Sequence, residues 1–108
     1  LPLVGFFAAV GQVATDRDGN VVGEEIETQT RQALENVGEI LESVDAGFDD
    51  VVKVTSYLVD IHGDYDGYKS VFGEFFEDPL PCHTMLGVAD LADEAFLVEL
   101  EVEAPLPG

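Results

Sequence analysis

The sequence predicts an α+β fold, in which a mixed β-sheet carries two helices on one face. Two segments have apolar residues at helical spacing, and others alternate apolar with polar residues. These segments follow one another as strand, strand, helix, strand, helix, strand, strand. With 108 residues the chain fits one domain, which we expect to span residues 1–108.

The amino-terminal segment has the pattern of two short strands and a hairpin. Leu3 to Ala9 is an apolar run, rich in aromatic residues, that ends near Gly11, and Gln12 to Thr15 follows it. The turn-forming residues 18–20, Asp-Gly-Asn, then precede a pair of valines. We therefore expect two strands and a hairpin before the first helix.

Two amphipathic helices are expected. In Glu24 to Val44 apolar residues recur at helical spacing, glutamates lie at the positive end of the helix dipole, and Gly47 lies beyond the last turn. After Gly63 an aromatic stripe has the same spacing, and the Asp-Pro pair at 78–79 ends it. The stripe consists of Tyr65, Tyr68, Phe72, Phe75 and Phe76. We expect it to pack on the sheet as core.

Three further segments have the period of a strand. Dense β-branched residues in 51–60 indicate a central strand, whose faces are Val52, Val54, Ser56, Leu58 and Lys53, Thr55, Tyr57, Val59. In 83–88 the alternation separates His83 and Met85 from Cys82 and Thr84. In 96–103 apolar residues alternate with Glu99, Glu101 and Glu103, which predicts one buried and one acidic face.

The sheet face away from the helices needs a cover. Tyr57 and Val59 are expected on that face, and both are too apolar for a fully solvated surface. Oligomerisation is therefore expected to cover it.

The charge balance is strongly acidic. Against 23 Asp and Glu residues there are four basic ones, which gives a net charge of -19. Nucleic acid is therefore not expected as a partner, because basic side chains supply most of that affinity. So many carboxylates indicate adaptation to molar salt, where a Debye length of about 3 Å screens their repulsion. An ordinary acidic protein is the alternative, because net charge speaks to solubility rather than to habitat.

The remaining composition bounds the chemistry. A single cysteine excludes an internal disulfide, and two histidines among dispersed carboxylates do not indicate a metal site. We expect Cys82 to be a small buried residue rather than a nucleophile, and His62 to be a structural residue in a loop. No apolar run approaches the roughly 20 residues of a spanning helix, and residues 1–10 lack the basic flank of a signal peptide. The expectation is a cytoplasmic protein that does not bind membranes.

Short matches in these elements cover nearly the whole chain. They are Gly11-Gln12, TRQALENVGEILE at 30–42, DDVVKVTSYLVDI at 49–61, FFED at 75–78, PCHTMLGV at 81–88 and LVELEVEA at 97–104. In their order and spacing the chain resembles the RidA/YjgF family, the reactive intermediate deaminases once described as translation inhibitors or L-PSP endoribonucleases.

The resemblance implies a homotrimer with a chorismate-mutase-like fold, in which three sheets enclose a central barrel and clefts lie between subunits. Family members of the deaminase type hydrolyse 2-imino or 2-enamino acids, such as 2-iminobutanoate and 2-iminopropanoate, without metal or cofactor. In them an arginine on the strand after the second helix holds the substrate carboxylate through a bidentate pair. A glutamate on the last strand positions or activates the attacking water.

The chain departs from this pattern at several positions. His83 stands where those deaminases have the arginine, so the fixed positive fork is absent, whereas the glutamate maps onto Glu99. Val10 stands where the family often has serine, and Lys69 where some members have asparagine. The family's amino-terminal segment, with its cleft tyrosine, is not found before the first strand. We expect either a truncated sequence or an altered cleft.

The predicted site has two catalytic residues, Glu99 and His83, which are expected to open into one shared pocket where subunits meet. A nearby Glu99 would raise the pKa of His83 above about 6.5, which would make it a cation that holds an anion or donates a proton. The backbone of Gly11 and Met85 and the charge of Lys69 are expected to bind the substrate carboxylate. The structural alternatives are a half-buried histidine, one more solvated glutamate and a solvated lysine.

Three functions are open at this point. The first is a trimeric deaminase, in which Glu99 orients water and His83 anchors the substrate or protonates the leaving ammonia. The second is a non-catalytic trimer that binds a small carboxylate-bearing metabolite in the same cleft, which loss of the arginine favours. The third is a ribonuclease, which conflicts with the charge balance and lacks a phosphate-stabilising group.

Overall fold

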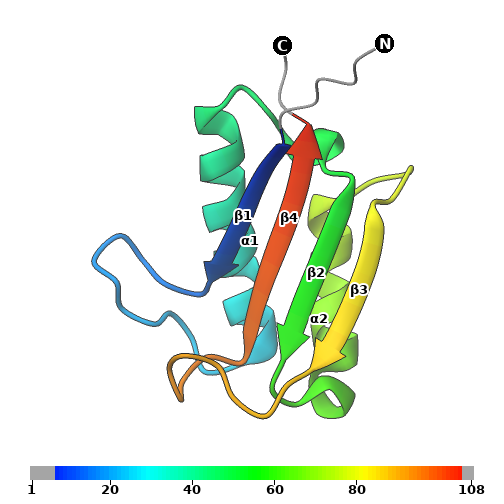
Figure 1. Cartoon of the computed structure of the whole chain (residues 1–108). Coiled ribbons are helices and arrows are strands. Elements are labelled where there is room, and N and C mark those ends of the chain that lie inside the picture. The colour runs from blue at the N-terminus through cyan, green and yellow to red at the C-terminus, as the bar shows by residue number, and fades with distance from the viewer. Residues whose placement is uncertain (1–6, 106–108) are drawn as a thin grey trace.

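The structure is a computed structural model that describes residues 7–105 (Figure 1). Its elements follow in the order β1 (Phe7–Val13), α1 (Ile26–Ser43), β2 (Lys53–Leu58), α2 (Ile61–Phe75), β3 (Cys82–Gly87) and β4 (Val98–Pro105). A short 3-10 helix, Phe48–Asp50, lies between α1 and β2. The predicted α+β fold with two helices is confirmed.

The four strands form one mixed sheet in the order β1-β4-β2-β3. β4 runs antiparallel to both β1 and β2, and β2 runs parallel to β3. β2 therefore lies inside the sheet, as its β-branched composition predicted. Within the described chain, β1 and β3 form the two free edges.

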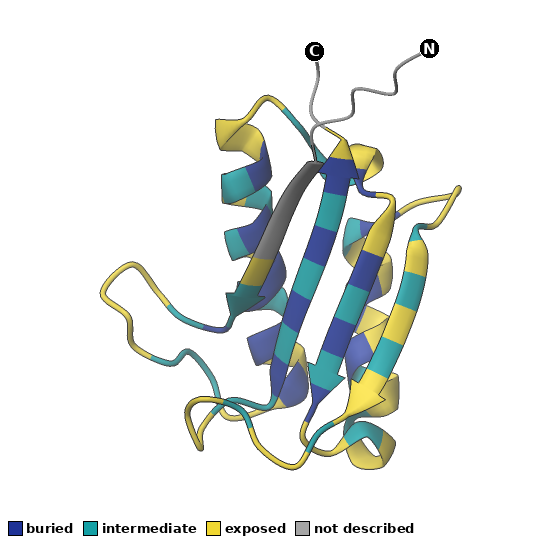
Figure 2. Cartoon of the chain, in the orientation of Figure 1, coloured by how far each residue is buried: buried dark blue, intermediate teal, exposed yellow. Residues whose placement is uncertain are grey.

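The register assigns side chains to the two faces of the sheet. Val54 pairs with His83 on one side and Val102 on the other, so these three side chains share a face. Figure 2 shows the alternation along β2 and β4, and the buried residues are Val54, Ser56, Leu58, Val98, Leu100, Val102 and Ala104. The three glutamates of β4 lie on the opposite face, which is called the open face below. The predicted division of β4 into an apolar and an acidic face is confirmed.

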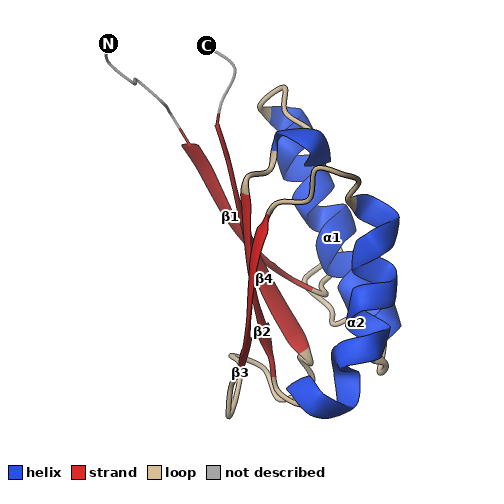
Figure 3. Ribbon diagram, turned by 90° about the vertical axis from the view of Figure 1, so that its right-hand side faces the viewer, coloured by secondary structure: helices blue, strands red, loops and turns tan. Residues whose placement is uncertain are grey.

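Both helices pack on the same face of the sheet (Figure 3). The apolar stripe of α1 is buried against it through Ile26, Ala33, Leu34, Val37 and Leu41. α2 begins after Asp60, whose side chain accepts a hydrogen bond from the Gly63 N–H at 3.2 Å. His62 therefore lies in the first turn of α2 rather than in a loop.

The aromatic stripe of α2 is only partly core. Tyr68, Phe72 and Phe76 are buried, and Phe72 stacks on Phe76 with ring centroids 4.3 Å apart. Tyr65 is 47% exposed, so its expected place in the core is wrong. Its helical spacing places it on the side of Tyr68 and Phe72, but it lies near the amino-terminal end of α2, where its ring stays exposed.

A buried glutamine of α1 holds the chain where it enters β4. Gln29 Nε2 donates to the carbonyl oxygens of Gly23 and Ala95, at 3.0 and 2.7 Å. Its Oε1 accepts from the Leu97 N–H at 2.8 Å. All the polar atoms of this buried amide have partners, which fixes the backbone two residues before Glu99.

The predicted amino-terminal hairpin is wrong in part. One strand, β1, runs to Val13, and the expected second strand is reduced to a single bridge between Thr15 and Val21. The Asp16 carboxylate explains this, because it accepts the N–H groups of Asp18 and Asn20 and so begins a tight turn. Residues 3–6 of the predicted first strand lie outside the described residues.

No helix within residues 7–105 combines the length and the apolar character that a membrane crossing requires.

Candidate functional site

The sheet separates the predicted site residues into two groups. His83 shares the helix-covered face with Val54, whereas Glu99 pairs with Tyr57 on the open face. Within one chain the two side chains therefore lie on opposite faces of the sheet. A pocket that contains both remains a prediction about an assembly, because one face of one chain does not provide it.

On the helix-covered face, His83 contacts two buried hydroxyl groups. Its Nε2 lies 3.0 Å from Ser56 Oγ and 3.1 Å from Tyr68 Oη, and the two hydroxyls hydrogen-bond each other. The imidazole ring also stacks on Phe72, with centroids 4.4 Å apart and planes inclined by 17°. β2, α2 and β3 each contribute to this cluster, which fixes the ring in position and plane.

The expected cationic state of His83 is wrong. Burial, and then the positive charge of Lys69, lower its pKa from 6.5 to about 4. The ring is therefore neutral at pH 7. The expectation assumed a nearby Glu99, but the sheet lies between the two residues. Burial also raises the pKa of the Tyr68 hydroxyl, which keeps its proton.

Lys69 lies on α2 beside this cluster, with Nζ 5.9 Å from the centroid of the Phe72 ring. The positive charge of Lys69 is thus close to His83 within the same chain. The side chain is exposed, so its ammonium is free to meet an anion from solution.

On the open face, the predicted residues Glu99 and Gly11 lie together. A Cβ built on Gly11 would lie 3.7 Å from Glu99 Oε2 and 3.6 Å from Glu101 Cγ. Glycine therefore leaves the space beside the carboxylate open. Tyr57 donates a hydrogen bond to Glu101 Oε1 at 2.5 Å, and this bond raises the pKa of Tyr57.

Met85, whose backbone was predicted to bind the substrate carboxylate, lies on the edge strand β3. The N–H groups of Cys82 and Val88 donate to the carbonyl oxygens of Val52, just before β2, and of Leu58, at its end. Alternate residues of a parallel strand bond the same neighbour, so the N–H groups of His83 and Met85 point away from β2. The Met85 side chain meanwhile packs on the core. The edge thus offers backbone donors close to the His83 cluster.

Cys82 is exposed, so the prediction of a buried cysteine is wrong. It pairs with Lys53 on the open face, at the edge strand, where no helix covers it. The alternation placed its face correctly but gave no information on what covers that face.

Sequence reasoning missed Ser56 and Tyr68 as parts of the site. Ser56 is a polar residue at a buried position of the alternation between Val54 and Leu58. Such a residue needs a buried hydrogen-bond partner, and this was a readable signal. The helical spacing of the aromatic residues assigned Tyr68 to the core, and nothing in the sequence indicated a hydrogen-bond partner for its hydroxyl. The hydrogen bond between Tyr57 and Glu101 was also missed, although both were placed on the same face.

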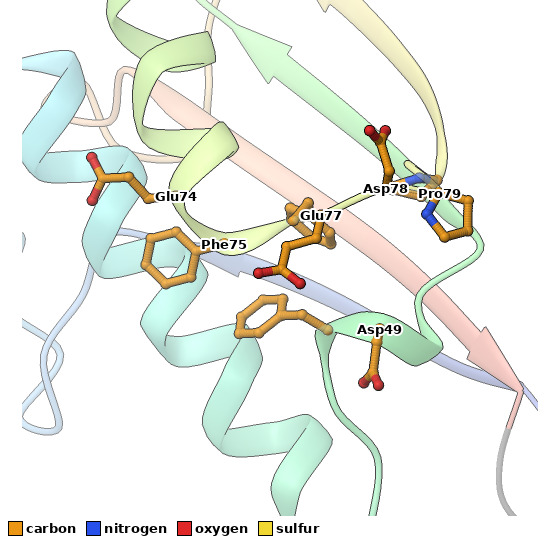
Figure 4. A pocket seen from close by; sticks show the side chains of 9 residues that line it. Asp49, Glu74, Phe75, Glu77, Asp78 and Pro79 are labelled. Carbon is orange, nitrogen blue, oxygen red and sulfur yellow. The ribbon is translucent and has the colours of Figure 1, made fainter.

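A separate hollow lies where α2 ends (Figure 4). Its volume is about 300 Å³. Phe48, Phe75 and Phe76 line it together with Pro79, Pro81 and the carboxylates of Asp49, Glu74, Glu77 and Asp78. None of the predicted site residues lines this hollow.

Within residues 7–105, no group of three or more His, Cys, Asp or Glu side chains is arranged to hold a metal ion.

Comparison with known proteins gives relatives over almost the full chain. The family model described as Endoribonuclease L-PSP matches residues 4–105. A RutC family protein of Pyrococcus horikoshii is 36% identical over 100 residues, which cover 92% of this chain and 78% of that protein. The chloroplastic Reactive Intermediate Deaminase A of Arabidopsis thaliana is 36% identical over 88 residues, which cover 82% of this chain and 46% of that protein.

Solved structures share the fold. RidA from the Antarctic bacterium Psychrobacter sp. PAMC 21119 matches with a TM-score of 0.86 at 28% identity, over 95% of this chain and 83% of that chain. Yeast Mmf1 matches with a TM-score of 0.87 at 29% identity, over 94% of this chain and 80% of that chain. The likeness therefore extends over all the elements that carry the two groups of site residues.

Proposed function

The chain belongs to the RidA/YjgF family, and from this membership we propose that it is a hydrolytic deaminase acting in a cleft between the subunits of a homotrimer. Its substrates would be 2-imino or 2-enamino acids, and its products 2-keto acids and ammonia. The relative named Reactive Intermediate Deaminase A supports this class of reaction.

The observation that carries the proposal is the arrangement of Glu99 over Gly11. A half-buried carboxylate on a rigid central strand is a hydrogen-bond acceptor that can orient a water molecule. Gly11 keeps the space next to Oε2 free, because any larger residue would contact the carboxylate. Both residues occupy positions that the family resemblance assigns to the site.

In this reaction the water oxygen bonds to C2 of the imino acid, and Glu99 accepts a proton from the water. The electron pair of the C=N π bond goes to nitrogen, which takes this proton, and a carbinolamine forms. The second proton of the water then passes from the carbinolamine hydroxyl to nitrogen, the C=O bond forms, and the C–N bond breaks as ammonia leaves with its electron pair. The chain supplies acid–base chemistry for this sequence, which is worth about 10² to 10⁴-fold in rate.

The substrate carboxylate would be held near the edge of β3. The Met85 N–H points away from β2, and Lys69 provides a positive charge on the neighbouring helix. A lysine binds an anion as a point charge and lacks the paired geometry of an arginine. We therefore expect weaker and less selective binding than in relatives that have the arginine.

The trimer would bring the open face of one chain near the edge of another. Tyr57 and the three glutamates of β4 are half-buried on this face in the single chain, and Leu86 is 45% exposed there. A face with this mixture favours contact with a second copy over full exposure. Sedimentation of the purified protein in molar salt measures the number of subunits directly.

The test of the deaminase uses a threonine dehydratase reaction, which releases the imino acid continuously. The purified protein is added in high salt, and keto-acid formation is followed. Acceleration by the native chain and its loss in Glu99→Gln would support the proposal. No acceleration by either the native chain or the double substitution His83→Arg, Lys69→Asn would remove it.

The alternative is a non-catalytic trimer that binds a small carboxylate-bearing metabolite in the same cleft. The neutral state of His83 favours it, because an uncharged imidazole is a weaker anchor for a carboxylate than a guanidinium. Thermal stabilisation by a keto acid without turnover would support this alternative over the enzyme.

A further inference from the structure

Three polar atoms form a closed triangle in the apolar layer between the sheet and α2. They are Ser56 Oγ, Tyr68 Oη and His83 Nε2, and each lies within hydrogen-bond distance of the other two. Ser56 and Tyr68 are fully buried. Within the described chain, the hydrogen bonds of these side-chain atoms run only to one another.

The number of hydrogens in this triangle decides the state of the imidazole. If Nε2 carried a hydrogen, it could not accept, and the two hydroxyls could donate only to each other. Two hydrogens would then compete for the single contact between the two oxygens, and one would have no acceptor. If Nε2 is unprotonated, one hydroxyl donates to the other and the second donates to Nε2. Buried donors without acceptors are costly, so the second arrangement is favoured.

We propose that Ser56 and Tyr68 are positioning residues that hold His83 as the neutral tautomer with its hydrogen on Nδ1. His83 then presents an uncharged, oriented N–H donor to an oxygen of a bound keto or imino acid. The identity of the ligand rests on the proposed function, whereas the tautomer of His83 is independent of it.

The surroundings of the ring support a fixed neutral donor. α2 faces it with Tyr68 and Lys69, which are the titratable side chains next to it in the described chain, and β2 faces it with Val54 and Ser56. Lys69 disfavours a second positive charge, and Phe72 holds the plane of the ring by stacking. Nδ1 points roughly opposite to Nε2 on the imidazole, so the hydrogen on Nδ1 is directed away from the two buried hydroxyls.

The tautomer is measured by long-range correlation of ring carbon-bound hydrogens with the ring nitrogens in ¹⁵N-labelled protein in molar salt. The chain has two histidines, and His83→Gln removes one set of signals, which assigns the other to His62. We expect His83 to carry its hydrogen on Nδ1 and to stay neutral from about pH 5 upward. A hydrogen on Nε2 of His83 would overturn the proposal.

Variants test the cause of this state. Ser56→Ala and Tyr68→Phe each leave one hydroxyl to donate to Nε2, so either variant alone should keep the tautomer. The double variant removes both donors, and we expect a mixture of tautomers. Because both hydroxyls are removed together, no buried hydroxyl is left without a partner, and only the half-buried Nε2 loses its donors. Tyr57→Phe is the matched control, because it removes a hydroxyl from the open face of the same strand.

The outcomes separate this proposal from the proposed function. Addition of 2-ketobutyrate should shift the Nδ1 signal of His83 without changing its tautomer. Because His83 stays neutral, its titration should not change the affinity for 2-ketobutyrate between about pH 5.5 and pH 8. The Nδ1 tautomer without turnover would contradict the deaminase and leave the positioning role intact. An unchanged tautomer in the double variant, or a shift of the control, would contradict the positioning role whatever the activity.

Discussion

The neutral state of His83 makes the stability of the fold depend on pH. Burial lowers its pKa in the folded chain from 6.5 to about 4. Between these values the unfolded chain takes up a proton that the folded chain does not bind. The contribution of His83 to the free energy of unfolding is therefore at its maximum above about pH 6.5, and it falls as the pH is lowered towards 4.

The size of the effect follows from the same pKa values. A pH of about 5 is about 1.5 units below the usual histidine pKa. At about 1.4 kcal/mol per unit, the free energy of unfolding would fall by about 2 kcal/mol for a fully buried ring. The ring is only half-buried, and solvent screening reduces this value. We therefore expect a loss of about 1 kcal/mol between neutral pH and about pH 5.

Urea denaturation of the native chain and of His83→Gln measures this loss. The native chain should lose about 1 kcal/mol more than the variant when the pH is lowered from neutral to about 5. The difference between the two proteins cancels the titration of the many carboxylates. Protein concentration is held constant, because dissociation of an oligomer would also shift the midpoint.

His62→Gln is the matched control, because it removes the other histidine, which is exposed, and leaves the cluster around His83 intact. Equal pH dependence of the native chain and His83→Gln would refute the burial of the imidazole. A native chain that gains stability over the variant on acidification would show instead that His83 is a cation paired with a carboxylate.

Three further results are expected. Leu34→Ala on the fully buried face of α1 should lower the free energy of unfolding by about 2 to 5 kcal/mol in urea, and a loss well below this range would contradict its burial. Gly11→Leu should reduce turnover or keto-acid binding, because its side chain would contact Glu99, and unchanged kinetics would argue against a site on the open face. Raising salt from about 0.1 M to about 1 M shortens the Debye length from about 10 to about 3 Å and should raise the melting temperature, whereas a constant value would contradict adaptation to salt.

The sequence predicted the sheet faces well, because a strand has a period of two whatever surrounds it. Val98, Leu100 and Val102 are buried, and the glutamates between them lie on the other face. The same period correctly separated Cys82 from His83. It failed at the first hairpin, where the Asp16 carboxylate captures two backbone N–H groups and replaces the expected strand with a turn.

The chemistry of the site was less predictable than its faces. Which side of β3 a helix covers is a property of tertiary packing, and this decides both the exposure of Cys82 and the burial of His83. The direction of the histidine pKa follows from that burial, so the alternation of residue types could not supply it. The resemblance to the family identified Glu99 and Gly11 as candidate site residues, and the structure places them together on the open face.

The resemblance to deaminases with an arginine at position 83 gives the two groups beside β3 a common interpretation. An arginine combines a permanent charge with donors in a fixed geometry. In the site we propose, the charge would come from Lys69 on α2 and the oriented donor from His83, and both side chains lie next to the Phe72 ring. His83→Arg alone is therefore not a simple restoration, because it places a second cation beside Lys69 and leaves the Ser56 and Tyr68 hydroxyls without their acceptor. Combining it with Lys69→Asn removes the repulsion between cations, so the double substitution is the sharper test of whether the cleft recovers tight carboxylate binding.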